Sequence, residues 1–91
     1  MLFRSLAINY HFLTPDWNVR VTVFDNKGRP VRLLKENTLV GTERGTFNWD
    51  GTTDGFHKAD VGVYVILLEG VNPVSGDKKN FRLGCVLAAK L

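Results

Sequence analysis

Apolar and polar residues alternate along the first part of the chain, as they do in strands that bury one face. Residues 2–12 form the first such stretch. Residues 18–24 form the second, in which Val19, Val21 and Val23 share one side, and β-branched residues favour strands. Both stretches are therefore predicted to be half-buried strands. The apolar side of the first stretch consists of Leu6, Ile8, Tyr10 and Phe12.

A turn signal follows the second stretch. Residues 25–29 are predicted to form a hairpin turn, because Asp and Asn favour tight turns and Gly28 can adopt a positive φ. Residues 30–34 are then expected to return as the partner strand, with Val31 and Leu33 facing inward.

The middle of the chain is less regular. Residues 35–45 show no clear period, and residues 34–39 are compatible with a short helical turn. Residues 46–50 alternate again, with Phe47 and Trp49 on one side, and are predicted to form a strand.

The most apolar run lies over residues 61–69 and is apolar on both sides, which predicts a central strand that is covered on each face or packed deep in a sandwich. Residues 70–80 are predicted to form a polar hairpin loop, and residues 81–87 the last strand. About six or seven strands without an amphipathic helix predict an all-β fold, an antiparallel β-sandwich. The 91 residues suit one domain spanning residues 1–91.

Charge and hydropathy exclude two classes of partner. The net charge is +3, but Lys78 and Lys79 form the only run of two basic residues, so the clustered basic groove of a nucleic-acid-binding protein is not expected. No apolar run approaches the roughly 18 residues of a membrane span, so membrane insertion is not expected. The first residues lack the basic leader and continuous apolar core of a signal peptide, so the signal of an exported protein would be expected upstream of this segment.

Candidate catalytic and metal-binding chemistry is sparse. Cys85 lies in an apolar run and is expected in the core, and His11 and His57 have no zinc-ligand spacing. The segment DGTTDG, residues 50–55, has the glycines of a calcium loop, but Val61 stands where the bidentate Glu is expected. Turn chemistry is the better interpretation, and we predict a non-catalytic domain without a cofactor or metal.

Aromatic residues offer one candidate ligand surface. Trp17, Phe56 and Tyr10 are candidates for a carbohydrate platform, provided that their rings are exposed. Trp49 and Tyr64 are predicted to pack in the core instead, because each lies in an alternating apolar strand.

Three segments carry a recurring pattern: VTVFDNKGRPVRLL (21–34), TFNWDGTTD (46–54) and VGVYVILLE (61–69). The pattern is a V-x-D-x-x-G-x-x-V hairpin, then W-D-G-x-(x)-D-x-G, then G-x-Y. It resembles the immunoglobulin-like domain of the flagellar hook-capping protein and C-terminal modules of exported Bacteroidetes proteins, including lamin-tail-domain proteins and type IX secretion cargo. The matching positions are Val23, Asp25, Gly28, Val31, Trp49, Asp50, Gly51, Gly62 and Tyr64.

This resemblance, which covers residues 20–91, implies an immunoglobulin/fibronectin-III-like sandwich at the C-terminus of a larger exported protein, outside the cell or on its surface. It implies one of two roles. The module is a sorting or attachment domain, whose last strand is read by secretion machinery, or it is a passive spacer or adhesion module that binds glycan. The upstream domains of the parent protein are partners in either case.

The chain departs from the family pattern in two places. Phe56 stands where the family has its second glycine, so this turn is expected to be built differently. The basic pair Lys78 and Lys79 leads into a last strand that contains Gly84, whereas the sorting modules usually continue with β-branched residues.

Overall fold

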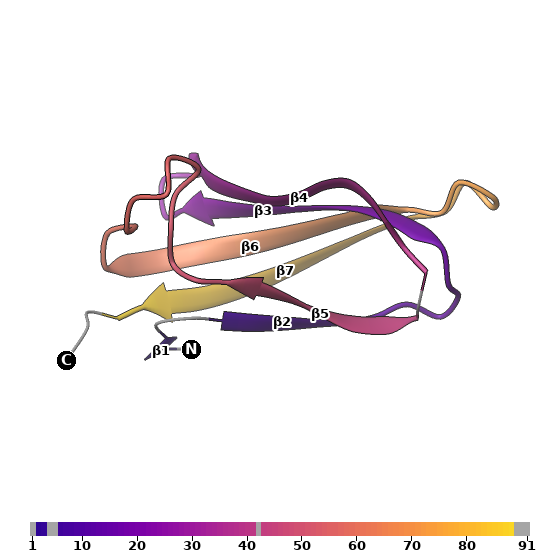
Figure 1. Cartoon of the computed structure of the whole chain (residues 1–91), viewed down its shortest axis with the longest axis horizontal. Helices are drawn as coiled ribbons and strands as arrows, with labels where there is room; N and C mark the ends of the chain where they lie inside the picture. Colours follow the sequence, from indigo (N-terminus) through magenta and orange to yellow (C-terminus); the bar gives the residue numbers. More distant parts are fainter. Residues whose placement is uncertain (1, 4–5, 42, 89–91) are drawn as a thin grey trace.

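The computed structural model describes residues 2–3, 6–41 and 43–88, and this part of the chain is all-β (Figure 1). Its strands form a five-stranded sheet, in the order β1-β7-β6-β3-β4, and a two-stranded sheet of β2 and β5. All pairings are antiparallel except the short parallel pairing of β1 with β7. The predicted β-sandwich is confirmed. The strands are β1 (Leu2–Phe3), β2 (Leu6–His11), β3 (Trp17–Asp25), β4 (Pro30–Val40), β5 (Arg44–Trp49), β6 (Gly62–Val71) and β7 (Lys78–Leu87).

The alternation predicted for the first stretch holds in β2, but the stretch is divided between two sheets. Leu6, Ile8 and Phe12 are buried, whereas Asn9 and His11 are exposed. β1 pairs with β7 of the large sheet, and β2 pairs with β5 of the small one. The first stretch therefore contributes one strand to each sheet.

β3 is the most deeply buried strand, because its valines face the small sheet and it has a neighbour on either side. Val19, Val21 and Val23 are buried, and β3 lies between β4 and β6 in the large sheet. The predicted hairpin turn follows it, with Gly28 at φ 79°. A valine-rich strand inside a sheet combines β-propensity with burial of its branched side chains.

The helical turn expected over residues 34–39 is wrong, because β4 continues to Val40 and pairs with β3 along this length. Register shifts interrupt that pairing, one of them between the pairs Val21–Lys35 and Thr22–Leu33. The shift leaves one extra residue on β4 and exchanges its faces. As a result Leu34, and not Leu33 as predicted, packs with Val31 against the core.

β6 lies inside the large sheet, but only one of its faces is covered. Tyr64, Ile66 and Leu68 are buried in the core. The residues that alternate with them point away from the small sheet: Val63 is 51% exposed, and Val65 and Leu67 are half-buried. Of the two predicted alternatives, the strand packed inside a sandwich is therefore confirmed, and the strand covered on both faces is not, because a two-layer sandwich has a second sheet on one side only.

The hairpin between β6 and β7 is shorter than the loop predicted over residues 70–80. The strands extend to Val71 and begin again at Lys78. Asn72 closes the loop, since its backbone N–H donates to the Asp77 carbonyl at 2.8 Å and its side-chain oxygen accepts from the Val74 N–H at 3.0 Å.

Candidate functional site

Asp25 organises the turn between β3 and β4. One carboxylate oxygen accepts hydrogen bonds from the backbone N–H groups of Lys27 and Arg29, both at 2.9 Å, and the other accepts from Arg29 Nε at 2.9 Å. These bonds, first of all the one from the Arg29 backbone, lower the pKa of Asp25 below its usual value. Asp25 and Gly28 are therefore used to build the turn.

The residues around Trp49 form a loop whose bonds are local. Trp49 is 0% exposed, and its indole N–H donates to the Thr52 carbonyl at 2.8 Å. One oxygen of Asp50 accepts from the Thr52 backbone N–H at 3.0 Å and from the Thr52 hydroxyl at 2.5 Å, which lowers the pKa of Asp50. Gly51 has a φ of 82°, a left-handed conformation that glycine adopts without a Cβ clash. Asp50 thus bonds within its own turn.

The same loop covers the outer edge of β4. The Asp54 N–H donates to the Val31 carbonyl at 3.0 Å, and the Leu33 N–H donates to an Asp54 carboxylate oxygen at 2.8 Å. Arg32 adds a hydrogen bond from its guanidinium to the Thr53 carbonyl at 2.8 Å. Backbone groups on an edge strand invite pairing with another chain, and this loop occupies them. Sequence reasoning assigned Asp54 to a turn and missed this second role.

Tyr64 forms a tyrosine corner, an arrangement found in immunoglobulin-like sandwiches. It stands near the start of β6, and its hydroxyl donates to the Asp60 carbonyl at 2.6 Å. Its ring meets that of Trp49 edge-on, with centroids 5.2 Å apart. Burial raises the pKa of the Tyr64 hydroxyl above its usual value. Gly62, two residues earlier, begins the strand.

Replacing Tyr64 by Phe is expected to lower the free energy of unfolding by about 1 kcal/mol, because it removes one hydrogen bond and keeps the ring. Urea unfolding followed by Trp fluorescence measures this loss as a lower transition midpoint at an unchanged slope. A midpoint equal to that of the unmodified chain would show that the hydroxyl contributes nothing to stability.

The carbohydrate platform predicted around Trp17 is not formed, because Trp17 is only 4% exposed. Its ring stacks on Phe12 with centroids 4.8 Å apart, and its indole N–H donates to the Thr14 hydroxyl at 3.2 Å. Tyr10 is half-buried and stacks on Phe47 at 5.0 Å. The Trp17 ring therefore offers no flat face to a sugar.

Phe56 is the one member of that predicted set that lies on the surface, at 78% exposure. Its φ of 61° is left-handed, which is unusual for a bulky side chain, and this is the place where the resembling family has glycine. The Arg32 guanidinium lies 4.8 Å from the ring centroid, in cation–π geometry.

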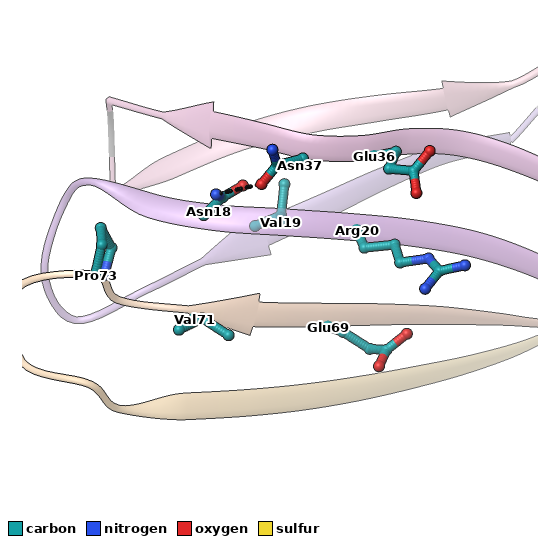
Figure 2. Close-up of a pocket in the computed structure, with 8 residues that line it drawn as sticks. All are labelled: Asn18, Val19, Arg20, Glu36, Asn37, Glu69, Val71 and Pro73. Carbon is teal, nitrogen blue, oxygen red and sulfur yellow. Dashed lines mark hydrogen bonds between the residues drawn. The ribbon is translucent and has the colours of Figure 1, made fainter.

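The outer face of the large sheet carries a groove of about 780 Å³ (Figure 2). Arg20 of β3 extends beside Glu36 of β4 and Glu69 of β6, and Arg20 and Glu69 are cross-strand partners. Asn18 Nδ2 donates to Asn37 Oδ1 at 2.7 Å on the neighbouring strands. This outer groove is open and polar, so its charged side chains remain in water.

A second groove lies at the side of the sandwich, between β2 of the small sheet and β6 and β7 of the large one. Its volume is about 380 Å³. Phe81 stands at one end of it, where its ring meets Phe12 edge-on with centroids 6.0 Å apart. Sequence reasoning did not find this side groove, although Phe81 was placed in a strand. Its lining consists of Ile8, Asn9, Tyr10, His11, Ile66, Leu68, Phe81, Arg82 and Leu83.

The groups considered for catalysis and metal binding lie apart. Cys85 is buried, its thiol points to the Tyr64 carbonyl at 3.7 Å, and burial raises the thiol pKa. His11 lies on β2 and His57 in the loop before β6. Within residues 2–3, 6–41 and 43–88, no group of three or more His, Cys, Asp and Glu is placed to hold a metal ion.

The described part of the chain contains no helix with the length and apolarity needed to cross a membrane. The chain matches no protein-family model, and no curated protein or solved structure is significantly similar to it.

Proposed function

We propose that this chain is a non-catalytic immunoglobulin-like module of an exported protein, and that it serves as that protein's C-terminal sorting or attachment domain. One observation carries the proposal: every residue of the recurring pattern is used to build the module. The pattern residues form turns, core contacts and a strand start, which leaves the surface of the strands for recognition. They are Val23, Asp25, Gly28, Val31, Trp49, Asp50, Gly51, Gly62 and Tyr64.

The position of β7 supports recognition through the last strand. Lys78 and Lys79 begin β7, and their side chains are exposed. Phe81 and Arg82 follow and are exposed as well. A secretion component that reads the last strand would therefore meet two lysines, an aromatic ring and an arginine on one strand.

The test is a reporter protein carrying this chain at its C-terminus, expressed in a Bacteroidetes host. We expect delivery of the reporter to the cell surface, and loss of that delivery in the double variant Lys78→Glu, Lys79→Glu. The matched control is Lys27→Glu, Lys35→Glu, which makes the same charge change on exposed lysines of the β3–β4 hairpin. The control is expected to be delivered normally.

A reporter that stays in the periplasm would contradict the sorting role. The module would then be a spacer or adhesion domain, the second function that the resemblance implies. The specific observation that favours this alternative is Phe56, whose exposed ring stands beside the Arg32 guanidinium. Both groups are of the kind that contact sugar rings and polar ligands on protein surfaces.

A further inference from the structure

One side of the sandwich has two strand edges without a neighbour in the described part of the chain. β2 has β5 as its single sheet neighbour there, so its other edge is unpaired. β7 pairs with β6 over its whole length, but on its other side β1 pairs only with Val86 and Leu87. The edge of β7 over residues 78–84 therefore presents unpaired backbone groups. The side groove lies between these two edges.

The floor of the side groove is apolar. Ile66 and Leu68 of β6 line it from within the core, and Leu83 of β7 borders it. Phe81 shares the core-facing side of β7 with Leu83 and Cys85, yet it is 47% exposed. The Phe81 ring is half-exposed because the small sheet, in the described part of the chain, ends at β2 and does not cover this part of β7.

The two edges of the large sheet differ sharply. The β4 edge is covered at Val31 and Leu33 by the Asp54 hydrogen bonds, and its pairing with β3 is interrupted by register shifts, both of which discourage an added strand. β7 instead pairs with β6 without a shift from Gly62–Leu87 to Val71–Lys78, so its edge is regular. A regular unpaired edge is a template for one more strand.

The charged residues at this edge favour an acidic added strand over a second copy of the chain. β2 and β7 contain no Asp or Glu, whereas β7 carries Lys78, Lys79 and Arg82 and β2 ends at His11. Two copies of this chain that paired edge to edge along β7 would bring these like charges together, which is unfavourable. A strand with carboxylates would be attracted to the same edge.

We propose that the side groove is a strand-accepting site, which takes an extended, acidic segment of a partner protein as an added strand on the β7 edge. Backbone hydrogen bonds to residues 78–84 hold the segment in register. Its apolar side chains, at every second position, contact Phe81 and Leu83, and its carboxylates, on the opposite face of the strand, lie near Lys78 and Arg82. The site does not depend on export, so its test is separate from that of the reporter.

The probe is a synthetic peptide of alternating Val and Glu, about seven residues long, which is an ordinary strand length. Backbone amide hydrogen exchange is measured by NMR on the 91-residue chain. At a peptide concentration of ten times its Kd, exchange at the β7 edge amides is expected to slow about tenfold. A peptide of alternating Val and Lys is expected to leave the exchange unchanged.

The double variant Lys78→Glu, Arg82→Glu is expected to weaken binding of the Val/Glu peptide about tenfold, as two exposed ion pairs would. It should also begin to bind the Val/Lys peptide. The control Lys27→Glu, Lys35→Glu should bind the Val/Glu peptide as the unmodified chain does. Should the β7 variant fail to fold, the two peptides on the unmodified chain decide the question.

Three outcomes overturn the proposal. The first is unchanged exchange over residues 78–84 with the Val/Glu peptide. The second is equal binding of the Val/Lys peptide, because charge would then play no part. The third is protection of the β7 edge that grows with protein concentration in the absence of peptide, because a second copy of the chain would then be the occupant.

Discussion

Trp49→Ala is expected to lower the free energy of unfolding by about 3–5 kcal/mol, the cost of removing a large aromatic side chain from a core. Trp49 lies at the end of β5, fully buried, and its ring packs edge-on against Tyr64 of β6. The substitution leaves a cavity between the sheets and also frees the Thr52 carbonyl, which accepts the indole hydrogen bond. Urea unfolding followed by circular dichroism gives the difference.

A second variant of Trp49 separates the contribution of the hydrogen bond from that of the ring volume, and a variant of an exposed ring serves as the control. Trp49→Phe keeps most of the ring volume and removes the hydrogen bond, so it should cost less than Trp49→Ala. Phe56→Ala truncates an exposed ring and should change stability by no more than about 0.5 kcal/mol. A loss below about 1 kcal/mol for Trp49→Ala would contradict the central place of this ring in the core.

Features of the fold that depend on neighbouring residues in the sequence could be predicted. Alternation in residues 6–12 and 18–24 gives the buried faces of β2 and β3, because side chains on a strand point to opposite sides in turn. The turn at Asp25 could be predicted for a similar reason. A short carboxylate bonds the backbone two to four residues further on, whatever the rest of the chain does.

Features that depend on partners far away in the sequence could not be predicted. The length of β4 is set by its pairing with β3, and that pairing overrides a local sequence that favours no element. Burial of Trp17 has a similar cause. Its ring stacks on Phe12 over Gly70 of β6, where an added Cβ would come within 3.2 Å of both rings. No residue near Trp17 in the sequence indicates that Gly70 lies against its ring.

The two grooves illustrate the same limit. An unpaired strand edge is a property of strand order, and the sequence does not state which of the predicted strands lies at the side of a sheet. One signal was present: Lys78, Lys79 and Arg82 stand on the last strand, and lysines on a strand often mark an edge. The lining of the side groove combines β2 with β6 and β7, so only the tertiary structure brings it together.

A chain that ends at Lys79 is expected to lose its cooperative unfolding transition altogether. The truncation removes all but two residues of β7, and with them the partner of β6 over nearly its full length. It also removes Cys85 and Leu87 from the core, and the pairing partners of β1. A domain of this size has a total stability of only about 5–15 kcal/mol, and loss of a strand inside the sandwich exceeds it.

Thermal and urea unfolding of the truncated chain test this expectation, with the full-length Lys78→Glu, Lys79→Glu variant as the control, since those side chains are exposed and the strand is kept. A cooperative transition in the truncated chain would contradict it. If the transition is absent, a failure of the truncated module to direct export would report unfolding and would say nothing about recognition. Recognition through β7 therefore has to be tested with surface substitutions in a folded module, because in this fold the last strand is both the candidate signal and an essential part of the core.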